Sequence, residues 1–454
     1  MTQEKKKARD GFSSSFGVLA ATLGSAVGLG NIWLFPYLTG SSGGAGFLIV
    51  YLAATLLVGL PVMISEITLG RQAKADAVSA MIKLAPKGRP WWLVSVFGVL
   101  AALMIMAFYT EVAGWVFAYV FKAIGGSLLS TDPKVTSAAF DSMVSDPVQA
   151  LVWQWVVLVV IGGILLMGVS KGIEAVTKRL MPLLFLLLIV LGVRSLMLPG
   201  AAAGINFLFH PDFSKITAQV LLSAMGLAFF KLSIGMATMM TYGSYFRDDQ
   251  NIPVTAFRVM SADLFVSLLA GIAIFPAVFA YGFAPGSGPK LLFITIPAVF
   301  ANMPFGNVFM VAFFLLASIA AIGAMLSLLE VPVSVMSERF GWKRPATTVL
   351  NLVLLAVLGS GCALSASLTS DVELFGMTLF DLFDFVSTKL LMPIGGIALS
   401  LFVGWVWGRD RFAAALSNGG TLDNGRLVGV VYTVLRYVSP LLILVVMLKG
   451  LGVF

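Results

Sequence analysis

The sequence has few charged residues and almost none of the side chains on which enzymes and metal sites depend. Charged residues make up 11% of the 454 positions, and the chain has one cysteine, Cys362, and one histidine, His210. A single cysteine excludes a disulfide framework, and a single histidine excludes a histidine-based metal cluster. The carboxylates are scattered. We therefore expect no cofactor and no enzymatic activity.

Hydrophobic residues, by contrast, make up 59% of the chain, and the mean hydropathy is +0.99. A soluble protein of this length could not keep so apolar a surface hydrated, so we predict an all-α polytopic membrane protein in a lipid bilayer. The net charge of +8 comes from short loops between apolar runs, which argues against a nucleic-acid partner. No soluble domain or low-complexity tail suggests an obligate protein partner.

Eleven apolar runs are long enough to cross a membrane as helices. They lie at 14–37, 45–70, 91–122, 148–168, 173–198, 217–246, 253–283, 304–337, 345–366, 385–407 and 427–449. The basic start, 1–13, is expected to be a tail before a retained first span, because no small-residue cleavage site is obvious. We predict two five-span repeats, 14–198 and 217–407, followed by an eleventh span in 427–454.

The loops predict the orientation of these spans. If the N-terminus is cytoplasmic, 20 of the 29 Lys and Arg residues fall on the cytoplasmic side, seven fall outside, and Lys231 and Arg436 lie within spans. Positive charge gathers on the cytoplasmic side of membrane proteins. We therefore expect a cytoplasmic N-terminus and, with an odd number of spans, a C-terminus outside.

Two spans contain glycine-rich interruptions. The first has three glycines between Gly24 and Gly30, followed by Asn31, and the sixth reads KLSIGMA from Lys231 to Ala237. A single glycine in a membrane helix usually serves packing, but this clustering favours a broken helix. Broken helices at corresponding positions of two halves are typical of transporters with a midplane site. Free N–H groups suit a carboxylate and free carbonyls suit an ammonium, so the site fits a zwitterion.

Five motifs strengthen this interpretation. They are GSAVGLGNIWLFPY from Gly24, GLPVMISEITLGR from Gly59, FYTEVAGW from Phe108, LSIGMATMMTYGSY from Leu232 and SLLEVPV from Ser327. Over nearly its whole length the chain resembles a bacterial member of the neurotransmitter:sodium symporter family, itself a known case of the broken-helix architecture. The resemblance implies an inverted-repeat fold with eleven spans, alternating-access import of amino acids, and residence in the bacterial cytoplasmic (inner) membrane.

The resemblance also implies a set of substrate-binding residues. The carboxylate would meet the N–H groups of Leu29 and Gly30 and the Tyr109 hydroxyl. The amino group would meet the carbonyls of Ala26 and Phe230 and the Ser233 hydroxyl. The wall around the substrate side chain would be Ile105, Tyr109, Phe230, Met236, Ala324 and Leu328. Apart from Tyr109 this wall is apolar, so we expect an apolar amino acid, with Met236 adapting to several sizes.

Gating residues are implied in the same way. In the fifth span, the segment between Gly172 and Pro182 is expected to unwind and admit water, because glycine and proline weaken a helix. Arg9 and Glu338 match the family's cytoplasmic gate pair. Leu34 and Leu227 replace the usual Arg and Gln of the outer gate, which favours an apolar lid and leaves Asp384 without its expected arginine. Asp384 is a secondary candidate for handling protons.

The ion sites depart from the family pattern. The first sodium ion would use Ala26, Asn31, Asp263 and a hydroxyl where this chain has Lys231. The second would use carbonyls of Gly24, Val27 and Ala320 and two hydroxyls where the chain has Gly323 and Ala324. An ammonium repels a sodium ion, and three carbonyls replace its water shell poorly. We predict a transporter that does not use sodium, with this second site degenerate.

Lys231 suggests what replaces the ion. A lysine at the end of a span often snorkels to the interface, but the adjacent break favours a position in the middle of the membrane. There its charge can contact Asp263 and the substrate carboxylate. Because the proton affinity of a buried amine depends on its hydration and its partner, proton-coupled symport is our leading hypothesis. The alternatives are a sodium-independent facilitator or exchanger with Lys231 as a fixed charge, and a conventional sodium:amino-acid symporter.

Four further ionisable residues lie in or near spans. They are Glu66, Glu111, Glu330 and Arg436. Charged groups inside a membrane usually face the bundle interior and pair there. We expect all four to be structural hydrogen-bonding residues facing the bundle.

Overall fold

The computed structural model describes residues 10–283 and 292–453. Within these ranges the chain is helical, apart from turns and one isolated bridge between Leu374 and Met377. The predicted gate residue Arg9 lies outside the described residues. The prediction of an all-α polytopic fold is confirmed.

Nine continuous helical segments in the described ranges are long and apolar enough to cross a membrane. They are Ala45–Ala73 (α3, η2, α4), Trp92–Ile124 (α6), Pro147–Leu166 (α8), Val169–Leu196 (η3, α9), Ile252–Ala280 (α13), Gly306–Arg339 (α15), Arg344–Ala366 (α16, η6), Leu379–Trp407 (α17, η7, α18, η8) and Gly425–Gly450 (α20, η9, α21). Each corresponds to one of the predicted apolar runs.

The first and sixth predicted spans are the broken ones. The first consists of α1 (Ser15–Ala26) and, after a bend of 53°, η1 (Gly30–Leu34) with α2 (Phe35–Ser41). The sixth consists of α11 (Ala218–Lys231) and the short α12 (Thr238–Ser244). Both interruptions therefore lie where they were predicted, at the glycine cluster of the first span and the KLSIGMA stretch of the sixth. The division into repeats at 14–198 and 217–407 stays a prediction.

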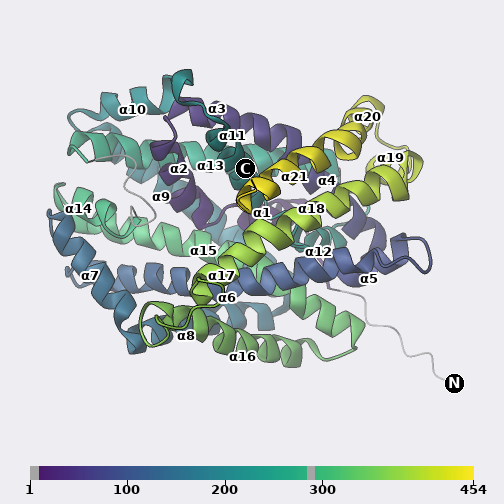
Figure 1. The fold of residues 1–454 in the computed structure, drawn as a ribbon, viewed down its shortest axis with the longest axis horizontal. Helices are drawn as coiled ribbons and strands as arrows, with labels where there is room; N and C mark the ends of the chain where they lie inside the picture. The colour runs from purple at the N-terminus through teal and green to yellow at the C-terminus, as the bar shows by residue number, and fades with distance from the viewer. Residues whose placement is uncertain (1–9, 284–291, 454) are drawn as a thin grey trace.

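Short helices mark the two ends of the bundle. In Figure 1, α5 (Ala77–Leu84), α19 (Arg409–Leu416) and α20 (Gly425–Thr433) lie at one end. Helices α7 (Pro133–Ser145), α10 (Ala201–Phe209) and α14 (Thr295–Ala301) lie at the other. In the interior, α6 packs against α15 and α12 packs against α4, so the two broken helices are surrounded by long continuous ones.

The fifth span is helical throughout in this structure. It begins as the π-helical η3 (Val169–Glu174), which contains Gly172, and continues as α9 (Ala175–Leu196) with Pro182 inside it. The start is held by the N-terminal segment: the Val169 N–H donates to Asp10 (2.7 Å) and the Ser13 N–H to Glu174 (2.6 Å). Unwinding between Gly172 and Pro182 stays a prediction.

Candidate functional site

The break in the sixth span is formed by unusual backbone conformations. Ser233, Gly235 and Ala237 all have positive φ, at 53°, 79° and 61°. Only glycine adopts this region readily, and at Gly235 an added Cβ would lie 2.4 Å from the Met392 carbonyl oxygen. The freed Gly235 N–H donates to the buried Glu66 carboxylate (2.7 Å). Strained residues of this kind are typical of functional sites.

The break in the first span is closed by Asn31. Helix α1 ends at Ala26, and Val27 is extended. The Gly28 N–H then donates to the Asn31 side-chain oxygen (3.2 Å), which satisfies one of the groups that the broken helix leaves free. The two breaks touch, because the Ser233 hydroxyl donates to the Ser25 carbonyl (2.8 Å).

Between the two breaks lies a small cavity of about 30 Å³. Of the ten predicted substrate-binding residues, nine line it: Ala26, Gly30, Ile105, Tyr109, Phe230, Ser233, Met236, Ala324 and Leu328. The space is about that of one water molecule in the liquid. An amino acid therefore enters only if the side chains around the cavity move.

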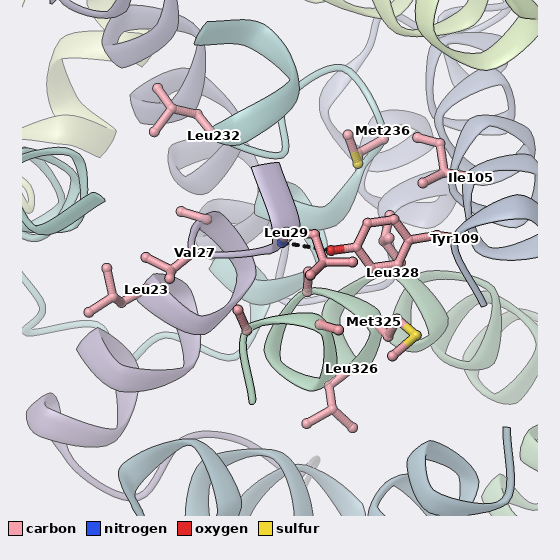
Figure 2. Close-up of a cluster of buried hydrophobic side chains, with 14 of the residues drawn as sticks. Leu23, Val27, Leu29, Ile105, Tyr109, Leu232, Met236, Met325, Leu326 and Leu328 are labelled. Carbon is pink, nitrogen blue, oxygen red and sulfur yellow. Dashed lines mark hydrogen bonds between the residues drawn. The ribbon is translucent and has the colours of Figure 1, made fainter. Parts of the chain in front are cut away.

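The predicted carboxylate-binding groups face one another. The Leu29 N–H donates to the Tyr109 hydroxyl (2.9 Å), and Figure 2 shows this bond with Ile105, Met236 and Leu328 around the tyrosine ring. Leu29 is the one predicted residue that lines the neighbouring larger cavity and not the small one. A hydroxyl beside a free helix end is suited to a carboxylate oxygen, since both groups can donate to it.

Lys231 lies in the middle of the fold with no solvent exposure of its side chain. Its Nζ is 3.0 Å from the Asp263 carboxylate and 2.9 Å from the Tyr51 hydroxyl, and it also donates to the Ser267 hydroxyl. The rings of Phe35 and Tyr51 lie 5.2 and 4.8 Å from the ammonium. An ammonium has three N–H donors, and here each has an acceptor. The predicted contact with the Asp263 carboxylate is present, but no donor is left in this structure for a substrate carboxylate.

Asn31 connects this charged pair to the break in the first span. Its amide nitrogen donates to the other oxygen of the Asp263 carboxylate (2.7 Å), while its oxygen accepts from Gly28. Both oxygens of Asp263 are therefore hydrogen-bonded. A buried ion pair is tolerated when such bonds offset the loss of hydration.

The predicted second ion position lies where α1 packs closely on α15. At Gly323 of α15 an added Cβ would lie 2.6 Å from the carbonyl oxygen of Gly24 in α1. Ala320 and Ala324, one turn apart on α15, are also buried, as is Val27. Within the described residues no group of three or more His, Cys, Asp or Glu side chains could hold a metal ion.

A larger cavity of about 480 Å³, here called the vestibule, adjoins the small one. Gly30, Tyr109 and Phe230 line both. The predicted outer-gate residues Leu34, Leu227 and Asp384 also line the vestibule. Asp384 is partly buried and forms no ion pair within the described ranges. The predicted inner-gate residue Glu338 accepts from the Asp76 N–H (2.9 Å).

Three of the four other ionisable residues in spans are hydrogen-bonded inside the bundle. Glu66 accepts from Gly235, Glu111 from the Trp115 indole (3.0 Å), and Glu330 from the Tyr245 hydroxyl (2.6 Å) and Arg344. The expectation was wrong for Arg436, whose guanidinium stacks on the exposed rings of Trp405 and Tyr437.

The comparisons with known proteins agree with this architecture. A family model described as the sodium:neurotransmitter symporter family matches residues 9–146 and 137–454. The chain belongs to this symporter family. An uncharacterized sodium-dependent transporter of Bacillus subtilis, YhdH, is 38% identical over 97% of this chain and 98% of its own length. A second uncharacterized sodium-dependent transporter, from Haemophilus influenzae, is 32% identical over 99% of this chain and 100% of its own length.

A solved structure gives the same result for the fold of this symporter. The crystal structure of MhsT in complex with L-phenylalanine has a TM-score of 0.89 and 40% identity, covering 97% of this chain and 100% of that one. The family resemblance predicted from the motifs is confirmed. The chain is a multi-pass membrane transporter, and it is not an enzyme.

Two residues around Lys231 were missed from the sequence. Ser267 lies four residues after Asp263, so it occupies the same face of α13, and this spacing was a usable signal. Tyr51 lies 180 residues before Lys231 and is brought to it only by the packing of the second span. Predicting all the hydrogen-bond acceptors around the ammonium would therefore have required the contacts between helices, which no local sequence pattern reveals.

Proposed function

We propose that this symporter imports an apolar amino acid by alternating access and does not use sodium. The observation that carries the proposal is the buried Lys231 ammonium, held by Asp263, Tyr51 and Ser267 beside the Asn31 side chain. A resident cation takes the place that the family gives to a sodium ion. Adding a second cation beside it would be electrostatically unfavourable.

The small cavity and its surroundings support the substrate class. Apart from Ser25, Tyr109, Lys231 and Ser233 the residues that line it are apolar, and the two broken helices add backbone N–H and carbonyl groups. The MhsT structure, 40% identical, holds L-phenylalanine. A carboxylate at Leu29, Gly30 and Tyr109 and an amino group at Ala26, Phe230 and Ser233 would fit the cavity once Phe230 and Met236 move.

The relatives from Bacillus subtilis and Haemophilus influenzae are named sodium-dependent. Sodium independence is therefore a departure from those names. It rests on two features of this chain, the ammonium at the first ion position and the contact between Gly24 and Gly323 at the second.

Two versions of the mechanism differ in whether Lys231 releases its proton during the transport cycle. In proton symport, an inward-facing state would hydrate Lys231 or separate it from Asp263, and the proton would leave on the cytoplasmic side. In facilitation or exchange, Lys231 stays charged throughout. The complete hydrogen bonding of the ammonium supports a charged lysine in this structure. Proton symport thus requires the network to be broken in another state.

Uptake into proteoliposomes separates these versions. We expect labelled phenylalanine or leucine to accumulate when choline replaces all sodium. An inward proton gradient should raise the uptake severalfold in proton symport and leave it unchanged in facilitation. Each charge that moves inward gains about 2.3 kcal/mol per 100 mV, so an imposed potential tests the same point. Uptake that occurs only with sodium would contradict the proposal.

We also propose the orientation that the loop charges predict, in a bacterial cytoplasmic membrane. The end of the bundle with α5, α19 and α20 would be cytoplasmic (Figure 1), and the vestibule would open outside. Labelling of single cysteines placed at Asp410 and Asp132 in intact cells tests this orientation. Only the second should react with a membrane-impermeant reagent.

A further inference from the structure

Among the described residues, no carboxylate pairs with the guanidinium of Arg436. Arg436 lies in the π-helical segment η9 (Val434–Val438) of the last span, and its Nε is buried without a hydrogen-bond partner. The described residues offer its guanidinium no ion pair. It instead stacks on Trp405 and Tyr437, with ring centroids 4.1 and 5.3 Å away. A charged side chain in a spanning segment is costly unless a partner compensates it.

The position of Arg436 is fixed by the backbone. The last span packs against η8 (Phe402–Trp407), and an added Cβ at Gly404 would lie 2.7 Å from the Arg436 Cα. The Trp405 indole N–H donates to the Arg436 carbonyl (3.1 Å), and the Tyr432 hydroxyl donates to the Gly404 carbonyl (2.8 Å). Two π-helical segments meet here, and such segments are frequent at functional sites. The guanidinium therefore lies beside two rings that meet edge to face.

The surroundings face the lipid and carry more positive charge. Trp405 and Tyr437 are 56% and 49% exposed, and Trp405 lies two residues before the end of its span, where aromatic residues mark the membrane interface. The Arg409 guanidinium lies near Gly429: a Cβ added to this glycine would be 3.9 Å from the Arg409 Nη2 atom. Gly429 lies roughly 10 Å before Arg436 along the same span, so Arg409 adds a second positive charge to this stretch of the helix.

We propose that Arg436 binds the phosphate group of an anionic phospholipid, whose acyl chains lie against Trp405 and Tyr437, and that Arg409 adds positive charge nearby. A guanidinium matches phosphate oxygens with two parallel hydrogen bonds in its own plane, so its contact with the Trp405 ring does not prevent them. Asp410 is exposed beside Arg409 and forms no ion pair with either arginine in the described part of the chain. Basic pockets between spanning helices bind lipid head groups in this way.

The test compares lipids on the purified full-length transporter. Phosphatidylglycerol, phosphatidylcholine and inorganic phosphate are titrated separately in detergent, and bound lipid is counted by native mass spectrometry. We expect phosphatidylglycerol to bind selectively and Arg436→Gln to weaken its apparent affinity about fivefold. Arg426→Gln, which removes an exposed charge from the same span, should leave the affinity unchanged.

Three outcomes would overturn the proposal. They are equal phosphatidylglycerol affinity in Arg436→Gln and the unchanged protein, equal binding of phosphatidylcholine, and competition by inorganic phosphate at the lipid's own concentration. Trp405→Leu is a second variant that keeps the charge and removes one ring. We expect weaker phosphatidylglycerol binding in it too, and unchanged binding would likewise contradict the site.

Discussion

Lys231→Ser should abolish sodium-free uptake and strongly destabilise the transporter. The change leaves the Asp263 carboxylate buried without its cation, with the Asn31 amide and the Tyr51 hydroxyl as its remaining side-chain donors. Breaking a buried ion pair from one side costs about 3–5 kcal/mol, and 3 kcal/mol corresponds to roughly a hundredfold change in an equilibrium. Uptake in choline should therefore fall by about a hundredfold or more, and any dependence on a proton gradient should disappear. Proteoliposome uptake and thermal unfolding measure the two effects.

Two control variants separate charge from folding. Lys231→Ser with Asp263→Asn removes both charges and should regain most of the lost stability without regaining uptake, because the resident cation is still missing. Lys215→Ser changes an exposed lysine 3.7 Å from Asp212 and should alter stability by no more than about 0.5 kcal/mol. Sodium-free uptake in Lys231→Ser at the unchanged protein's rate would show that the ammonium has no role in transport.

Gly323→Ser should force α1 away from α15. Introducing the hydroxyl that the family resemblance implies at this position places a Cβ 2.6 Å from the Gly24 carbonyl oxygen, a backbone atom that cannot move alone. Such overpacking costs about 1–3 kcal/mol. The displaced helix α1 also leads into Leu29 and Gly30, so we expect uptake to fall at least about tenfold, as measured alongside the unfolding temperature.

Ala324→Ser is the matched control for this prediction. Its Cβ is already present, and its side chain lines the small cavity. We expect a stable protein with altered substrate preference and no gain of sodium dependence. Recovering sodium coupling would require Lys231→Ser together with Gly323→Ser and Ala324→Ser. Of these changes, Gly323→Ser is the hardest to accommodate, because of the contact with Gly24. A stable Gly323→Ser protein with undiminished uptake would contradict the close packing of α1 on α15.

The sequence was most informative where one residue type has a strong physical consequence. Runs of about 20 apolar residues predicted the spans, and the glycine cluster of the first span and the Ser-x-Gly motif of the sixth predicted the breaks. In the sixth span Gly235 has the positive φ that glycine adopts readily. Lys231 and Asp263 were paired in advance because both occupy positions of the family's first ion site, and the structure has them 3.0 Å apart. The residues that line the small cavity were predicted from the family motifs.

What was missed depends on distances between helices. Tyr51 reaches Lys231 from another span, and no local pattern identifies it. The closeness of Gly323 to Gly24 depends on the distance between α1 and α15, which the sequence does not give. The sequence therefore indicated that two sodium ligands are missing, but not that the two helices pack so closely there. Arg436 was expected to face the bundle, but the packing of Gly404 against its backbone turns it toward two exposed rings.

The most direct test of the central claim is substrate binding as a function of sodium concentration. The equilibrium Kd of the purified transporter for labelled phenylalanine or leucine is measured in choline chloride, with sodium chloride replacing it stepwise at constant ionic strength. With Lys231 as the resident cation, the Kd should be the same at every sodium concentration. Binding that requires sodium, or a Kd that falls about tenfold or more as sodium rises, would contradict the account.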